Sequence, residues 1–375
     1  MKQIITYSRQ DCFKTCRKRQ WYAYEIGMRK VLDAKALRMG HAYHAGLEAL
    51  GLTGETIRAV EAVQNEYQYC PDQIDSNEWR MEEETLVRLL CGYIWRWQDD
   101  RLTHLAPEAS FRIPLTNPAT GAASKLFDFA GKIDGIVQME DGRTAVLEHK
   151  LLGESLDSDS AIWKRLQFDH QLSFYILAAR ELGHDVSTAL YDVTRKPTIK
   201  PKEIPCLDRE GRKVVLDRNG IRQFKKNGTP YVTGNAEKGW MLQQAMMTVD
   251  EWGEHLNKDI AERPDYYYAR VEVPRLDQEL EECRAEAWDI QQTLREAQRA
   301  GRWYRTCNRN TCPYCPYEGP CMSGFDPRAD PLPDGFEFVD NKHPELGEPT
   351  DGNDLPTTPQ SAPAAAREGE PYSPI

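Results

Sequence analysis

The feature that most constrains the fold of this chain is a β-hairpin. Residues 125–138 and 144–150 are rich in β-branched, aromatic and other apolar residues with repeated alternation, and Asp141-Gly142 between them favours a tight turn. The pattern predicts two antiparallel strands side by side. Any domain built by this chain must accommodate that strand pair.

The segments around the hairpin alternate between helical and strand patterns. Apolar residues three and four positions apart predict helices, and short runs rich in β-branched residues predict strands. We expect helices at 38–69, 78–100, 161–183, 248–261 and 277–300, and further strands at 110–115, 187–194 and 266–273. A basic, turn-rich stretch at 195–234 is expected to lie over the active-site face, and no internal repeat is evident. This order predicts an α/β domain with a mixed central sheet flanked by helices.

Charge and length set the limits of that domain. The chain has 375 residues and a net charge of −11, and no apolar run approaches the ~20 residues needed to cross a bilayer. Residues 326–375 hold 11 acidic side chains, 3 basic ones and 10 of the 23 prolines. We therefore expect residues 1–325 to form one domain and 326–375 to be a disordered tail. The first residues lack the apolar stretch of a signal peptide, so a cytoplasmic protein with reduced cysteines is expected.

The hairpin carries the residues best suited to chemistry. Side chains alternate across a strand, so Glu148 and Lys150 share one face while His149 points to the other, and Asp134 can join the face of Glu148. Two carboxylates offer the hard oxygen ligands that Mg²⁺ or Mn²⁺ prefers, and an ammonium beside a metal can orient an attacking water. A surface hairpin with charges paired across its strands is the alternative interpretation. Gly131 and Gly135 flank the aspartate and would let a backbone or substrate approach.

Two helical segments, one before and one after the hairpin, contain further candidates for metal-binding or catalytic residues. His44 and Glu48 lie one turn apart in the first helical segment, and His44 is a possible further metal ligand, although a single helical histidine is more often structural. Gln171 and Tyr175 lie one turn apart in the helix that follows Lys150. Taken alone, this second pair is better explained by an ordinary amphipathic helix with Phe168, Leu172 and Tyr175 packed inward.

The order of these four motifs resembles the RecB/AddB-type branch of the PD-(D/E)xK nucleases. The motifs are Gly-x₃-His, Gly-x-Ile-Asp-Gly, Glu-x-Lys and Gln-x₃-Tyr, ending at residue 175, and Ile133 stands where the family name has proline. The resemblance implies a DNA nuclease, with an exonuclease favoured over an endonuclease. It implies that His44, Asp134, Glu148 and the backbone carbonyl of His149 ligate the metal, while Lys150 activates water. Gln171 and Tyr175 would hold the lysine and the DNA backbone.

A cluster of cysteines near residue 310 predicts a second metal site. Four cysteines in a Pro- and Gly-rich segment suggest structural zinc in a reducing compartment; they are Cys307, Cys312, Cys315 and Cys321. The segment Cys16-Arg-Lys-Arg-Gln-Trp-Tyr-Ala-Tyr24 resembles the N-terminal cysteine motif of iron–sulfur nucleases in the same branch. That resemblance implies a [4Fe–4S] cluster on Cys16, Cys312, Cys315 and Cys321, a staple between the segments 12–16 and 307–321. Zinc remains the alternative.

Basic tracts predict contacts with DNA. The first covers residues 9–38 and the second 195–229, where the candidates for phosphate contact are Arg195, Lys196, Lys200 and Lys202. Candidates for stacking on unpaired bases are Trp21, Tyr22, Phe224 and Tyr231. Solvated surface is the alternative for each tract. A standalone nuclease of this type fits recombination, repair or phage DNA processing in a bacterial or phage-infected cell, with a helicase or single-strand annealing protein as possible partner. The competing class is a non-catalytic DNA-binding or assembly protein on the same scaffold.

Overall fold

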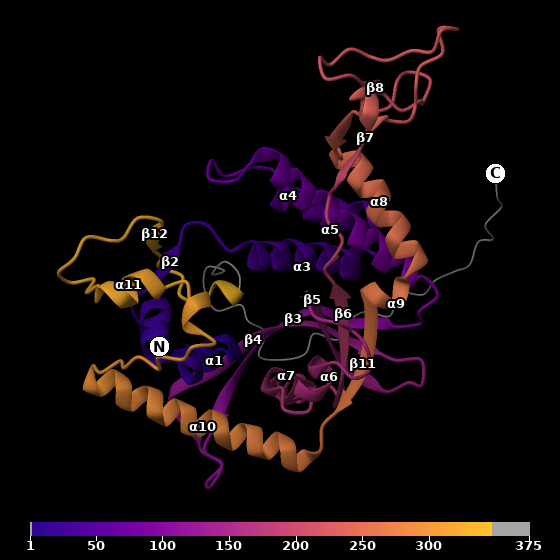
Figure 1. The fold of residues 1–375 in the computed structure, drawn as a ribbon. Helices are drawn as coiled ribbons and strands as arrows, with labels where there is room; N and C mark the ends of the chain where they lie inside the picture. Colours follow the sequence, from indigo (N-terminus) through magenta and orange to yellow (C-terminus); the bar gives the residue numbers. More distant parts are fainter. Residues whose placement is uncertain (1, 347–375) are drawn as a thin grey trace.

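A six-stranded mixed sheet forms the centre of the molecule (Figure 1). The structure, a computed structural model, describes residues 2–346. The strands run in the order β1-β4-β5-β6-β11, and β3 pairs with β4. Their bounds are Gln3–Ile5 (β1), Thr103–Thr116 (β3), Ala123–Gln138 (β4), Thr144–Leu152 (β5), Val186–Arg195 (β6) and Tyr268–Pro274 (β11). The expected mixed α/β fold is confirmed.

Two different strands pair with the same edge of β4, each along a different part of its length. Its residues Gly135–Gln138 pair antiparallel with β5, and its residues Phe127–Phe129 pair parallel with β1. The stretch 130–134 between these ladders has neither strand as a registered partner. The strands β4 and β5 therefore separate at residue 134, and this separation opens the sheet where the predicted carboxylates lie.

Helices cover both faces of the sheet. Helices α1 (Tyr7–Thr15), α6 (Ala161–Leu166), α7 (His170–Glu181) and α10 (Asp277–Ala300) pack on one face, in a core that includes Phe129, Ile133 and Ile176. On the other side lie α3 (Lys35–Thr53), α4 (Thr56–Glu66), α5 (Ser76–Arg96), α8 (Val249–Glu262) and α9 (Pro264–Tyr267). Figure 1 shows these two groups of helices on opposite sides of the strands. Residues 38–69 and 161–183 each form two helices, not the single expected one.

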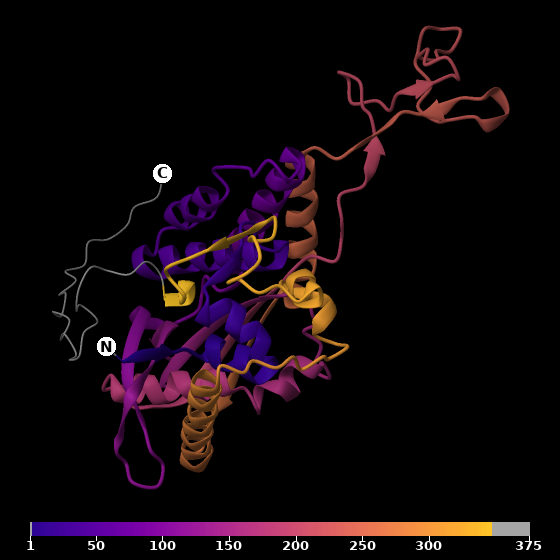
Figure 2. The ribbon, with the colours of Figure 1, turned by 90° about the vertical axis from the view of Figure 1, so that its left-hand side faces the viewer.

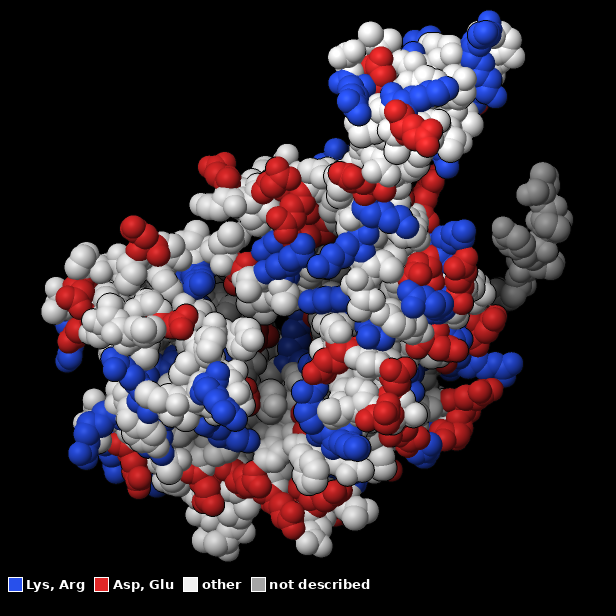
Figure 3. Space-filling model, in the orientation of Figure 1, with Lys and Arg blue, Asp and Glu red and all other residues white. Residues whose placement is uncertain are grey.

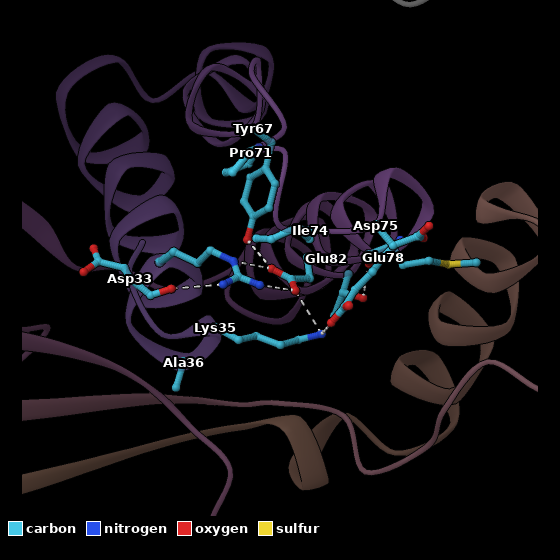
Figure 4. Close-up of polar contacts among 12 residues, drawn as sticks. Asp33, Lys35, Ala36, Tyr67, Pro71, Ile74, Asp75, Glu78 and Glu82 are labelled. Carbon is cyan, nitrogen blue, oxygen red and sulfur yellow. Dashed lines mark hydrogen bonds and ion pairs between the residues drawn. The ribbon is translucent and has the colours of Figure 1, made fainter. Parts of the chain in front are cut away.

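Ion pairs fix helix α3 against helix α5. Glu82 of α5 is 2% exposed and accepts from the Arg38 guanidinium at 2.6 and 2.8 Å. Lys35 contacts the same carboxylate at 3.0 Å and also pairs with Glu78, as Figure 4 shows, and the Tyr67 hydroxyl donates to Glu82 Oε2 at 3.4 Å. Because Arg38 contacts both oxygens of this buried carboxylate, removing the guanidinium would be costly even though Lys35 remains. The network therefore fixes the helix that carries His44.

Residues 203–246 form an arm that stands away from the body, as Figure 2 shows most clearly. Its root is the antiparallel pair β7 (Glu203–Pro205) and β10 (Gln244–Met246), and its outer part contains β8 (Val215–Leu216), η2 (Ala236–Lys238) and β9 (Met241–Leu242). The arm points away from the sheet, so the expectation that the segment 195–234 covers the active-site face is wrong. Within the arm, residues 206–243 bury very few side chains fully, and exposed polar turns cannot pack down onto a body without an apolar face.

The early and late parts of the described chain meet in a small sheet. Strand β2 (Met28–Lys30) pairs antiparallel with β12 (Phe336–Phe338), next to α2 (Arg17–Gln20), η1 (Trp21–Glu25), η3 (Cys312–Tyr314) and α11 (Glu318–Ser323). The last described element is η4 (Pro344–Leu346). A disordered tail from residue 326 is therefore wrong for 326–346, because backbone pairing with β2 supplies the contacts that composition did not predict. Residues 347–375 lie outside the described part. None of the helices within residues 2–346 is long and apolar enough to cross a membrane.

Candidate active site

Asp134 lies where β4 and β5 separate. The ladder between the two strands ends at the pair Gly135 and Leu147, so Asp134 and Glu148 are the next residues on each strand. The carboxylate of Asp134 accepts the backbone N–H of His149 through Oδ2 at 2.8 Å. A side chain thus replaces the backbone hydrogen bond that the diverging strands no longer make. This contact fixes Asp134 at the edge of the opening.

Helix α3 brings His44 to the other oxygen of Asp134. The His44 Nδ1 lies 3.4 Å from Asp134 Oδ1. Burial alone would raise the pKa of Asp134, but His44, with His149 and Lys150, holds it well below its ordinary range. Burial alone would lower the pKa of His44, but the Asp134 charge raises it. The aspartate is therefore ionised at neutral pH and ready to accept a cation.

A chain of contacts connects Glu148 to helix α7. The Lys150 ammonium contacts Glu148 Oε1 and donates to Gln171 Oε1 at 3.0 Å. The Gln171 amide donates to the Tyr175 hydroxyl at 3.0 Å. Glu148 is 1% exposed. The structure therefore brings these four predicted residues together on the face that sequence alternation indicated.

Burial and mutual charge set the ionisation of this group. Burial raises the pKa of Glu148 to about 7, although Lys150 opposes the shift. Burial by itself would lower the pKa of Lys150, but the carboxylates of Glu148 and Asp134 raise it above its ordinary range. The lysine is thus a protonated cation at neutral pH. It is held beside a carboxylate that is expensive to ionise without a compensating positive charge.

The opposite face of β5 carries a separate polar network. His149 Nδ1 lies 3.5 Å from Asp192 Oδ2, and that oxygen also accepts from Tyr93 at 2.6 Å and Arg270 at 2.7 Å. Burial lowers the pKa of His149 to about 4, so the imidazole is neutral. As predicted, His149 points away from Glu148. Its side chain fixes the strand from behind, and its backbone stays beside Asp134.

The small residues beside Asp134 have a different role from the expected one. A Cβ added at Gly131 would lie 2.6 Å from the Phe111 ring and 3.5 Å from Tyr175. The missing side chain therefore makes room for Phe111, not for substrate. Gly135 has only ordinary contacts with Leu147. The inward packing expected for Phe168 is also wrong, since this ring is 81% exposed.

Two tyrosines near the site were not predicted. Tyr191 of β6 is in register with Glu148, which places both side chains on one face of the parallel pair. Tyr7 begins α1 directly after β1. Burial raises the pKa of each hydroxyl, and the charges of Lys150 and Glu148 act on both. Strand alternation was sufficient to find Tyr191, but only the tertiary pairing of β1 with β4 brings Tyr7 close.

The donor set fits a divalent cation. Glu148 Oε2 is buried and makes no hydrogen bond with any residue of the described chain, although its neighbour Oε1 contacts Lys150. A buried carboxylate oxygen without a partner is costly and is suited to a metal ligand. Asp134 and His44 lie on the same side. Across residues 2–346, however, no group of three or more His, Cys, Asp or Glu side chains is already gathered closely enough to hold a metal ion. Small side-chain movements would have to complete the site.

The predicted cysteines line one pocket of about 510 Å³. Its walls include Cys16 from the early segment together with the four late cysteines, Cys307, Cys312, Cys315 and Cys321. Burial alone would raise the pKa of the Cys16 thiol, but hydrogen bonds from Thr306 and Arg19 lower it. Cys12, by contrast, is buried outside the pocket lining, and burial raises its pKa to about 12. Cys16, not Cys12, therefore lines the same pocket as the late cysteines, although within residues 2–346 these thiols do not yet form a metal-binding group.

The predicted DNA-contact residues lie at the end of the sheet that carries Lys150. Lys150 pairs with Val193 and Leu152 with Arg195, so Arg195 and Lys196 follow directly on the neighbouring strand. Arg195 lies over the Tyr266 ring at 4.0 Å, and Lys196 donates to the Ala36 carbonyl at 3.3 Å.

Other predicted nucleic-acid contacts differ in exposure. Lys200 and Lys202 are exposed between the body and the arm. Tyr22 is 0% exposed, so its predicted stacking on bases is wrong. The Tyr231 ring already packs against Trp240 in a tilted arrangement, with ring centroids 4.7 Å apart, whereas the Phe224 ring is 52% exposed.

Comparison with known protein families agrees with this geometry. Carboxylates and a lysine lie together at a split between two strands of a mixed sheet, an arrangement suited to metal-assisted phosphate chemistry. A model of the PD-(D/E)XK nuclease superfamily matches residues 4–322, which is most of the chain. The chain belongs to the PD-(D/E)XK nuclease superfamily, whose members typically use Mg²⁺ or Mn²⁺. A search of curated proteins found no match to it.

Proposed function

We propose that this nuclease is a deoxyribonuclease that hydrolyses phosphodiester bonds from DNA ends with Mg²⁺ or Mn²⁺. The observation that supports this proposal best is the continuous set of contacts from His44 through Asp134 to the His149 N–H, beside the set from Glu148 through Lys150 to Gln171. Such an arrangement places oxygen ligands next to a fixed ammonium. Phosphodiester hydrolysis needs both.

Four groups would hold the metal: the side chains of His44, Asp134 and Glu148 and the backbone carbonyl of His149. When bound, the ion would polarise a phosphate oxygen and make a water more acidic. Asp134 is suited to this role because it remains ionised, and Glu148 because its Oε2 lacks another partner. The network of Asp192 behind the strand limits how far His149 can move.

Lys150 would orient the attacking water and stabilise negative charge on the phosphate. It has donors to spare, because an ammonium has three and the structure uses two, on Glu148 and Gln171. Gln171 holds the lysine, and Tyr175 holds Gln171 in turn. The Tyr175 hydroxyl is kept protonated by burial, so it can also donate to the DNA backbone.

We further propose that the cysteine pocket holds a [4Fe–4S] cluster on Cys16, Cys312, Cys315 and Cys321. Support comes from the way the pocket joins the two ends of the nuclease domain and from the lowered pKa of Cys16, since the thiolate is the ligand form. Zinc on Cys307 with the other late cysteines is the second candidate, because Cys307 lines the same pocket. Purified protein that is brown and contains iron supports the cluster, whereas colourless protein with stoichiometric zinc contradicts it.

The biological setting follows from the proposed reaction. Degradation of DNA ends serves recombination, repair or phage DNA processing, in the cytoplasm of a bacterium or an infected host. A helicase or a single-strand annealing protein is the partner that such a reaction would need. Arg195, Lys196, Lys200 and Lys202 would guide the phosphate backbone toward Lys150.

Labelled linear and circular DNA incubated with Mg²⁺ or Mn²⁺ tests the function directly. We expect the parent protein to degrade linear DNA from its ends, to leave closed circles intact, and to lose activity in the Glu148→Ala variant. Cleavage of closed circles would make the protein an endonuclease. Intact DNA with either metal would favour a non-catalytic DNA-binding protein on this scaffold.

A further inference from the structure

The arm is a positively charged part of an acidic protein. Residues 206–243 hold eight Lys or Arg and four Asp or Glu, whereas the whole chain has a net charge of −11. Two of the four carboxylates are neutralised inside the arm, because Asp208 pairs with Arg212 and Arg222, and Glu210 pairs with Arg212. Figure 3 shows Lys and Arg side chains spread over this projecting lobe. The arm therefore presents more positive than negative charge to solvent.

Three turns of the same kind follow one another in the arm. In each turn a glycine with left-handed φ donates its N–H to the carbonyl three residues earlier, at 2.9 or 3.0 Å. Only glycine adopts this backbone conformation without strain. The turns begin at Asp208, Asp217 and Lys225, and their glycines are Gly211 (φ 74°), Gly220 (φ 78°) and Gly228 (φ 82°). The arm thus contains three successive turns that each depend on a glycine.

Every one of these turns carries a cation at its second position. The three residues are Arg209, Arg218 and Lys226, and all three are exposed. Within residues 2–346 none of them forms an ion pair, unlike Arg212 and Arg222 beside them. Long cations at the tips of turns, free of carboxylates, are suited to a polyanion. Their spread over several turns favours a backbone contact over a small ligand.

The arm offers few platforms for unpaired bases. Tyr231 and Trp240 pack against each other, which leaves Phe224 as the exposed aromatic ring of the arm among the described residues. Proteins that bind single strands usually provide several aromatic surfaces for successive bases. Isolated cations with one exposed ring instead match the phosphates of a duplex.

We propose that the arm is a second DNA contact, which binds the duplex backbone outside the region held by the catalytic centre. The proposal rests on the proposed deoxyribonuclease function. The arm stands away from the sheet (Figure 2). We therefore expect a long duplex to contact both the active site and the arm, and a short duplex to contact only one of them. The arm would thus increase affinity for long DNA and leave the catalytic residues unaffected.

Removal of the arm tests this arrangement. Pro205 and Gln244 are direct partners in the root pair, so replacing 206–243 by Asn-Gly closes it with a tight turn. In the Glu148→Ala background, which separates binding from cleavage, we expect deletion to weaken binding of a duplex of about 40 base pairs roughly 10-fold or more. Binding of a duplex of about 12 base pairs should change by less than about 2-fold. The proposal would be overturned if deletion of the arm left the affinity for both duplexes unchanged, or if it weakened the binding of both equally.

A charge variant tests the same idea with the fold of the arm intact. The triple substitution Arg209→Gln, Arg218→Gln and Lys226→Gln should lower the slope of log K against log salt by roughly 2 to 3 for the long duplex. The matched control neutralises Arg80, Lys125 and Arg299, exposed cations of the body that likewise form no ion pair within residues 2–346, and should leave the slope nearly unchanged. An unchanged slope in the arm variant would rule out the DNA contact. It would instead favour a protein partner that binds the exposed side chains of Leu207 and Ile221. Because this measurement is binding alone, failure of the parent to cleave DNA would be a separate result.

Discussion

The catalytic centre and the cysteine pocket are both candidate metal sites, but they are built differently. The first lies on strands β4 and β5 and helices α3 and α7, and its side chains already bind one another. The second lies largely on turns around η3 and α11, and its thiols surround a pocket of about 510 Å³. A site whose side chains largely hold one another before its metal arrives needs only small movements to position a substrate for chemistry. A site whose segments need the metal to hold them together contributes mainly to folding.

The largest effect is expected from removing the lysine. Lys150→Met should lower single-turnover cleavage of linear DNA by roughly 10²- to 10⁴-fold, because it removes the group that orients water and stabilises charge. The melting temperature should change little, since a protonated Glu148 can then remain buried without its partner. Lys164→Met on α6 is the matched control. Cleavage near the parent rate in Lys150→Met would contradict the assigned centre.

Loss of one cysteine should affect stability before chemistry. Cys315→Ser should remove the metal or cluster and lower the free energy of unfolding by roughly 3 kcal/mol or more, with cleavage per folded molecule maintained. Metal analysis with urea denaturation measures both quantities. Cys70→Ser, at an exposed cysteine outside the pocket, should change neither. If Cys315→Ser abolished cleavage at full stability, the contrast between the two sites would fail.

The polar network around Asp192 lies on the face of β5 opposite Glu148. Changing this network should affect the stability of the protein more than it affects metal binding by Asp134 and Glu148. Asp192→Asn should lower the free energy of unfolding by roughly 2 to 4 kcal/mol, because Arg270 would be left buried beside a neutral amide. Equilibrium denaturation is the measurement. Asp157→Asn, in the loop between β5 and α6, is the control. An unaltered unfolding midpoint would show that this face does not fix the strand.

A smaller effect is expected from the glutamine that holds the lysine. Gln171→Ala removes the acceptor for Lys150 and the donor to Tyr175, so cleavage should fall roughly 10- to 100-fold, as expected for one hydrogen bond to a charged group. Gln171→Glu keeps the acceptor and should retain more activity than the alanine variant. Equal loss in both variants would indicate that the donor to Tyr175 matters more.

The smallest expected effect separates the two candidates for the cysteine pocket. If the pocket holds an iron–sulfur cluster, Cys16→Ser should remove iron while Cys307→Ser leaves most of it. If the pocket holds zinc on the late cysteines, Cys307→Ser should remove the zinc while Cys16→Ser leaves most of it. Iron and zinc content after purification under anaerobic conditions decides between them.

Local periodicity predicted the relative positions of the site residues, but not all of their roles. Glu148 and Lys150 could be placed on one face because side chains alternate, and Gln171 and Tyr175 one helical turn apart, whereas the roles of the last two came from the family resemblance. The position of Tyr7 was out of reach, since it depends on the parallel pairing of β1 with a strand more than 120 residues later. The pairing of β12 with β2 was hidden for the same reason, because the acidic, proline-rich composition around residue 336 is also typical of disorder. The arm was predicted as basic and turn-rich, but nothing local fixes the direction in which a hairpin projects.

The pairing of β2 with β12 also has a consequence for how the protein is made. Residues 28–30 can pair with their partner strand only after residues 336–338 have left the ribosome. The backbone of β2 therefore stays unpaired throughout nearly all of translation. Contacts of such long sequence separation slow folding and leave unpaired strands available to other chains. Nascent chains that stall before residue 336 should therefore be the ones that depend most on chaperones.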